Sequence, residues 1–153
     1  LTNVIFTYVG ISLIDKLGRR SLMYIGSIGY IVSLTLISLS FILEWGGIVL
    51  PIFLFLFIAS HAIGQGAIIW VYISEIFPNH IRSYGQSFGI STHWVLAAII
   101  PSLIPFLFGS IGPGIVFGFF AFMMVLQLIF THFIMPETKG VSLEDLSKKL
   151  IKN

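Results

Sequence analysis

Long apolar segments separated by short polar turns constrain this chain more than any other feature of its sequence. Crossing a lipid bilayer as a helix takes about 20 apolar residues. Four segments meet that length, at residues 21–43, 48–74, 87–108 and 115–135. The 153-residue chain is 57% hydrophobic and only 9% charged, whereas a soluble domain is about a quarter charged. So little charge cannot cover a water-facing surface, and the sequence therefore predicts an all-α membrane protein with several spans.

The two ends of the chain differ from these spans. Residues 1–14 are apolar but too short to cross a bilayer, and they lack the basic start of a signal peptide. We expect them to be the remainder of a span, and the chain to be a C-terminal fragment of a longer protein. Residues 1–140 then form the transmembrane region and residues 141–153 a cytoplasmic tail. In the tail, the spacing of Leu143, Leu146 and Leu150 favours a short amphipathic helix, with a frayed tail as the alternative.

The basic residues predict how the spans are oriented. All eight Lys and Arg residues fall on one side of the expected spans, and the opposite turns, at 44–47 and 109–114, contain none. The positive-inside rule makes the charged side cytoplasmic, together with the C-terminus. The eight residues are Lys16, Arg19, Arg20, Arg82, Lys139, Lys148, Lys149 and Lys152.

Several polar and aromatic residues are expected near the middle of the bilayer. At a rise of about 1.5 Å per residue, Asn3, His61, His93 and Trp94 lie about 17 to 21 Å from the charged edge of a core about 30 Å thick. Trp70 lies lower, about 8 Å above that edge. Hydrogen-bonding and aromatic groups that converge at this depth are typical of a carrier's binding site. The alternative is that the polar groups only join helices and that the tryptophans face lipid.

Other classes of site find little support in the sequence. Every acidic residue lies at an expected interface, so no serine–histidine–acid set can form at one depth, and we expect no enzyme and no catalytic residue. The chain has no cysteine, and His61 and His93 have no visible third ligand, so we expect no metal. Gly64-x-Gly66 is not followed by lysine and is not a phosphate loop. We also expect no cofactor and no nucleic-acid partner.

Three separated motifs resemble the sugar porters of the major facilitator superfamily. Asp15-x-x-Gly18-Arg19-Arg20 is similar to the family's charged loop between its eighth and ninth spans. Trp70-x-x-x-Ser74-Glu75-Ile-Phe-Pro78, followed by Arg82, is similar to its tenth span and the exit from it. Pro136-Glu137-Thr138-Lys139-Gly140 is similar to the element after its twelfth span. The resemblance covers the whole chain, from late in the eighth span to the end.

This resemblance implies a fold and a function. The chain would be the C-terminal part of a twelve-helix fold, whose two six-helix halves hold the substrate between them and give alternating access. It would help to transport a monosaccharide, a hexose or pentose, across the cell membrane, expected as sugar:proton symport. The alternatives are a carrier of a polyol or other small solute, and a non-transporting sugar sensor. The implied partners are the sugar, protons, the lipid bilayer and the missing N-terminal half, in which the proton-coupling acid would lie.

The resemblance also implies two sets of site residues. Sugar hydroxyls need neutral donors and acceptors, and the C–H faces of sugars pack on indole rings. The polar and tryptophan residues expected near the middle of the bilayer therefore suit a sugar. At two of these positions the chain departs from the family, since His61 stands where an aromatic residue is usual and His93 where an amide is usual. The implied substrate-binding residues are Asn3, His61, Gly66, Trp70, His93 and Trp94. The implied cytoplasmic gate network consists of Asp15, Arg19, Arg20, Glu75, Arg82 and Glu137.

Overall fold

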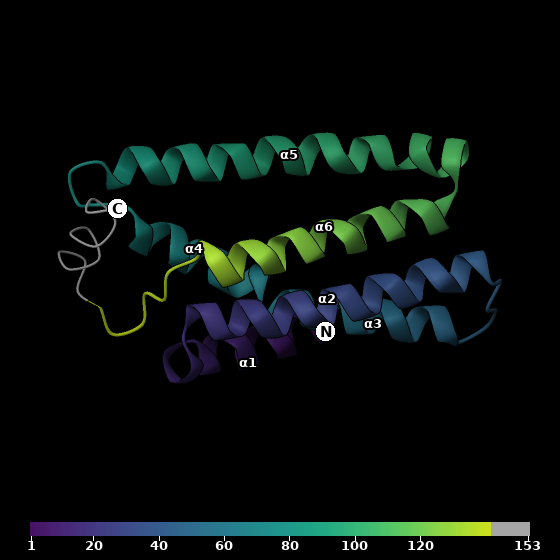
Figure 1. Ribbon diagram of the computed structural model, residues 1–153, viewed down its shortest axis with the longest axis horizontal. Helices are drawn as coiled ribbons and strands as arrows, with labels where there is room; N and C mark the ends of the chain where they lie inside the picture. Colours follow the sequence, from purple (N-terminus) through teal and green to yellow (C-terminus); the bar gives the residue numbers. More distant parts are fainter. Residues whose placement is uncertain (142–153) are drawn as a thin grey trace.

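The computed structural model describes residues 1–141, which form six α-helices (Figure 1). The helices are α1 (Thr2–Leu17), α2 (Arg19–Ile42), α3 (Val49–Ile63), α4 (Gln65–Ile76), α5 (Arg82–Ile111) and α6 (Pro113–Phe133). The described part contains no strand, as the sequence predicts. The amphipathic helix expected in the tail lies outside the described residues.

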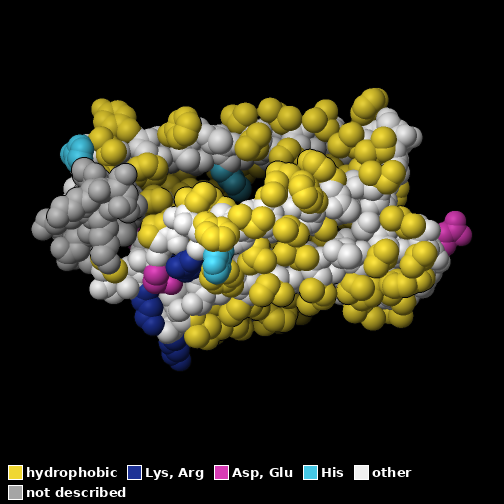
Figure 2. All heavy atoms as spheres, viewed as in Figure 1, with side chains coloured by type: hydrophobic (Ala, Val, Ile, Leu, Met, Phe, Trp, Pro, Cys, Tyr) yellow, Lys and Arg dark blue, Asp and Glu magenta, His cyan; other side chains and the backbone are white. Residues whose placement is uncertain are grey.

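Four helical stretches are long and apolar enough to cross a membrane: α2, α3 together with α4, α5, and α6. They run along the long axis of the molecule, and the shorter α1 lies beside α2 and α3 (Figure 1). The α1–α2 and α4–α5 connections and the segment after α6 meet at one end. The Lys and Arg side chains visible on the face in Figure 2 gather at this same end. The fold thus brings the charged turns of the sequence together.

Helix α2 forms the centre of the bundle, since it contacts α1, α3, α4 and α6. Its apolar side chains contribute to two buried clusters. One contains Leu22 and Met23 of α2 with Ile68 and Tyr72 of α4. The other packs Tyr30 and Leu34 of α2 near α6. These clusters hold α4 and α6 against a common helix, which positions the polar residues between them.

The apolar segment 48–74, expected as one continuous span, is divided at Gly64 into α3 and α4. Gly64 has φ −91° and ψ −108°, which lies outside the helical region. It crosses Gly26 of α2 at very close range. A Cβ atom added at Gly26 would lie 2.8 Å from the Cα of Gly64, and one added at Gly64 would lie 2.7 Å from the Cα of Gly26. Neither position has room for a side chain, because backbone meets backbone.

Helix α5 lies along one side of the molecule and contacts α4 and α6 (Figure 1). None of its residues is buried within the described part of the chain. The helix includes Pro101 and Pro105 without ending at either. Phe77 is extended before Pro78, as expected of a residue that precedes proline, and this ends α4 before α5 begins at Arg82.

Candidate functional site

A cavity of about 400 Å³ lies between the α3–α4 break and helices α2, α5 and α6. Figure 2 shows a hollow between α5 and α6 with a histidine side chain in its depth. Four of the residues that the sequence assigns to a substrate site line this cavity: His61, Gly66, Trp70 and His93. The remaining lining residues are Met23, Gln65, Ile69, Gln127 and Phe130. None of the lining residues carries a formal charge, apart from what the two histidines can acquire.

The rings in this cavity have defined relative orientations. Trp70 of α4 meets His93 of α5 edge to face, with centroids 5.0 Å apart and planes at 78°. His61 of α3 forms a hydrogen bond through Nδ1 to the hydroxyl of Tyr30, at 2.5 Å. The other ring nitrogen of His61 lies beside Gly66, where an added Cβ would be 2.9 Å from Nε2. Gly66 therefore leaves the space that the imidazole needs.

The two other residues assigned to the substrate site do not line this cavity. Asn3 lies exposed in the first turn of α1, and its Oδ1 accepts a hydrogen bond of 2.9 Å from the hydroxyl of Thr7. Trp94 is 63% exposed, although its ring meets that of His93 edge to face at 5.5 Å. The side chains of both residues thus lie outside the lining of this cavity.

Sequence reasoning missed a polar cluster in the wall of the cavity. The hydroxyl of Ser27, which is fully buried in α2, accepts hydrogen bonds from the amides of Gln65 and Gln127, at 3.4 and 3.2 Å. The cluster thus joins α2, α4 and α6 at one point. The sequence could have indicated Gln127, because it is an amide in an apolar span. A helical rise of about 1.5 Å per residue puts it about 15 Å from Glu137, near the middle of the bilayer. The depth argument that selected the histidines would also have selected it.

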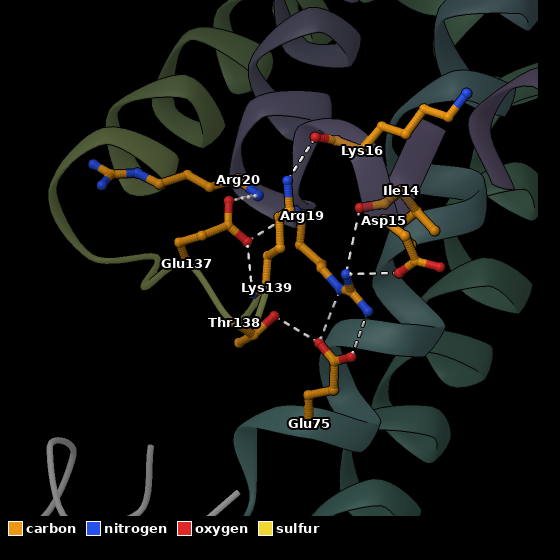
Figure 3. Close-up of polar contacts among 9 residues, drawn as sticks. All are labelled: Ile14, Asp15, Lys16, Arg19, Arg20, Glu75, Glu137, Thr138 and Lys139. Carbon is orange, nitrogen blue, oxygen red and sulfur yellow. Dashed lines mark hydrogen bonds and ion pairs between the residues drawn. The ribbon is translucent and has the colours of Figure 1, made fainter. Parts of the chain in front are cut away.

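A second set of polar contacts lies at the charged end of the molecule (Figure 3). The guanidinium of Arg19 forms a two-point fork on Glu75, with Nη2 to Oε1 at 2.8 Å and Nε to Oε2 at 3.1 Å. It also contacts Asp15 at 3.2 Å. The Arg19 side chain is 12% exposed, the Glu75 side chain 23% and the Asp15 side chain 83%. The fork is thus the sheltered pair, and the contact with Asp15 lies in water.

Glu137 contacts the start of α2 from the segment after α6. Its carboxylate accepts hydrogen bonds from the backbone N–H groups of Arg19 and Arg20, at 2.9 and 3.1 Å. These N–H groups have no partner within a helix, and a negative charge at a helix N-terminus is favourable. The approach depends on Gly18, which has φ +91° and whose added Cβ would lie 2.5 Å from Oε2 of Glu137. Thr138, the next residue, donates to Glu75 at 2.6 Å, so the two carboxylates form one network.

The other two basic residues assigned to the network make different contacts. The side chain of Arg20 donates to the backbone carbonyls of Thr131 and His132 at the end of α6. Arg82 donates through Nε to the carbonyl of Phe77 at 3.3 Å. Its Nη2 atom is buried and has no hydrogen-bond partner among the described residues. Arg82 therefore lies near the end of α4 without a carboxylate partner in this part of the chain.

No group of three or more His, Cys, Asp or Glu side chains within residues 1–141 could hold a metal ion. His61 and His93 line the same cavity, but the remaining polar lining groups are amides and an indole. The arrangement can offer neutral hydrogen bonds and aromatic faces.

Sequence comparisons relate the chain to membrane carriers. Residues 1–150 match the family described as "Sugar (and other) transporter". The chain is 39% identical over 155 residues to the arabinose-proton symporter of Bacillus subtilis, a match that covers 99% of this chain and 33% of that protein. It is 34% identical over 163 residues to myo-inositol transporter 1 of Saccharomyces cerevisiae, which covers 95% of this chain and 28% of that protein.

A solved structure has the same fold. The inward-open xylose transporter XylE from E. coli matches with a TM-score of 0.91 and 30% identity, over 97% of this chain and 34% of that one. This match confirms the all-α membrane fold expected from the sequence. The chain spans about a third of the length of the relatives that it matches.

Proposed function

The chain belongs to the sugar (and other) transporter family, and we propose that it forms the C-terminal part of a carrier that moves a monosaccharide across the cell membrane. It is a multi-pass membrane protein, with four stretches of helix long enough to span. The resemblance to sugar porters that its motifs predict is confirmed by the family match. One observation supports the proposed function above the others: His61, Trp70 and His93, which come from three different helices, line one cavity between apolar helices.

The chemistry of the cavity suits a hexose or pentose. A sugar presents hydroxyl groups that both donate and accept hydrogen bonds, and the amides and imidazoles of the lining can do the same. The indole of Trp70 offers an apolar face for sugar C–H groups. The lining has no Asp, Glu, Lys or Arg, which favours an uncharged solute, because an unpaired charge would be costly at this depth. Asn3 and Trp94 remain proposed contacts, for conformations of the carrier that bring them to the substrate.

We propose sugar:proton symport as the mode of transport. A protein that is 39% identical to this chain and named an arabinose-proton symporter supports this mode. A polyol is the second candidate substrate, favoured by the 34% identity to a protein named for myo-inositol. A polyol offers the same hydroxyl groups to the cavity, so the cavity chemistry alone supports both.

The charged network is proposed to hold the cytoplasmic end closed in one state of an alternating-access cycle. Arg19, Glu75 and Glu137 join three separate segments of the chain, and such contacts must separate if the helices move apart at this end. The positive-inside rule supports a cytoplasmic location for this end and for the C-terminus. The relatives are about three times as long as this chain, so we infer that transport also needs the carrier's other helices and the surrounding bilayer.

Transport assays on the complete carrier that contains this sequence test the proposed function. We would follow labelled xylose, glucose and myo-inositol into proteoliposomes, with and without an inward proton gradient. Saturable entry of a monosaccharide that the gradient stimulates is the expected result. Entry of myo-inositol alone would favour the polyol carrier. Absence of all three fluxes from a folded, monodisperse protein would contradict the proposed function.

A further inference from the structure

We propose that Tyr30 is a positioning residue that fixes which ring nitrogen of His61 carries the proton. The imidazole then presents Nε2–H as a hydrogen-bond donor to the sugar cavity. This inference rests on the proposed function, because it concerns the specificity of the same cavity. It adds a buried residue of α2 that does not itself line that cavity.

The proton assignment follows from the partners available to Tyr30. Its hydroxyl has one hydrogen-bond partner among the described residues, Nδ1 of His61. A phenol proton needs an acceptor, and Nδ1 of His61 is the one that residues 1–141 place within hydrogen-bond distance. A neutral imidazole has one N–H group and one acceptor nitrogen, so acceptance at Nδ1 puts the proton on Nε2.

Packing holds Tyr30 in place. The residue is 8% exposed, and its ring lies 5.0 Å from that of Phe57, which comes from α3 one turn before His61. Leu34 of α2 and Ala121 of α6 complete the same buried cluster. The phenol hydroxyl therefore belongs to α2, the central helix of the bundle, and its position does not depend on the broken α3–α4 span alone.

The other ring nitrogen of His61 lies next to a residue that lines the cavity. Nε2 lies beside Gly66, which lines the cavity with Trp70 and His93. No hydrogen bond from Nε2 to another described residue is present. The structure therefore leaves one preset donor at this point, and a solute that fits must place an acceptor oxygen against it. A hydroxyl or ring oxygen of a sugar meets this requirement, whereas a C–H group at that position leaves the donor unpaired.

Binding of monodeoxy sugars to the complete carrier tests this assignment. The unmodified protein is expected to bind one monodeoxy analogue of its sugar about tenfold more weakly than the sugar itself, because that analogue leaves the His61 donor unpaired. The Tyr30→Phe variant keeps the ring but frees Nδ1, so the proton is no longer set. We expect its penalty for that one analogue to fall below about threefold, with the penalties at other sugar positions unchanged. The His61→Phe variant is expected to lose the same penalty.

The chain offers a matched control in a second tyrosine–histidine pair. The hydroxyl of Tyr24 contacts Nδ1 of His132 at 2.9 Å, and His132 is exposed near the end of α6. The Tyr24→Phe variant is expected to keep the unmodified pattern of penalties. Elution as a single species and an unchanged thermal midpoint show that each variant is folded.

Two results would overturn the inference. In the first, Tyr30→Phe or His61→Phe keeps the full penalty for every analogue. In the second, Tyr30→Phe weakens binding of all analogues equally, as a purely structural role would. If the unmodified carrier binds no sugar at all, the proposed function fails, and this inference fails with it.

Discussion

At the scale of single residues, geometry separates contacts that look alike in the sequence. Asp15 and Glu75 both pair with Arg19, but the first lies in water and the second is sheltered with two parallel hydrogen bonds. A planar guanidinium on a carboxylate gains from both bonds, whereas an exposed ion pair contributes little. Glu75 also accepts from Thr138, so its loss would leave more than one donor without a partner.

We predict that Glu75→Gln destabilises the carrier by about 2 kcal/mol, because it removes the charge from a partly buried fork. Asp15→Asn is the matched control, and its expected effect is below about 1 kcal/mol. Thermal unfolding of both variants in detergent, beside the unmodified protein, measures the difference. Equal losses of stability in the two variants would show that the Arg19–Glu75 fork contributes no more than the exposed contact with Asp15.

At the scale of elements, the break between α3 and α4 is the feature on which the cavity depends. It puts His61 near the end of one helix, Gly66 at the start of the next and Trp70 one turn further along. The break packs on α2 through the contact of Gly26 with Gly64, where the two backbones touch. Close backbone approach through small residues is a common basis of helix packing in lipid.

A methyl group added at this crossing is expected to be costly. Gly26→Ala should destabilise the protein by about 1 to 3 kcal/mol, because the new Cβ meets backbone atoms that cannot rotate away. Gly109→Ala in α5 is the control, since an added Cβ there has nothing within 4 Å. That change should be neutral or stabilise by up to about 1 kcal/mol, because alanine favours helix more than glycine does. Thermal unfolding midpoints that shift in the same direction for both variants would contradict this account.

The sequence predicts spans better than it predicts the break within one of them. Hydropathy locates α2, α5 and α6 because lipid demands long apolar runs. It gives no signal of a break at Gly64, since the residues on both sides are mostly apolar. Depth counting selected His61, Trp70 and His93, which line one cavity, because it measures position along a helix. It also selected Asn3 and Trp94, which do not line the cavity, because depth carries no information about the direction in which a side chain points.

At the scale of the whole molecule, helix α5 differs from the other described helices in its burial. It contributes His93 to the cavity, yet none of its residues is buried within the described chain. Helix α4 contributes Gly66 and Trp70 to the cavity and Glu75 to the charged network, so movement of α4 would affect both. The molecule thus combines a cavity whose lining has no Asp, Glu, Lys or Arg with a charged end, within a chain about a third as long as its relatives.

Equilibrium binding of a labelled sugar to the purified complete carrier tests the central claim, that this cavity holds the substrate. Trp70→Ala removes the indole of the cavity, and Trp45→Ala removes one of similar exposure, 41% against 39%, from the α2–α3 connection. We predict that Trp70→Ala weakens binding about tenfold or more, because the sugar loses its aromatic face, and that Trp45→Ala changes it less than twofold. Unchanged affinity in a folded Trp70→Ala carrier would contradict the claim that the sugar occupies this cavity.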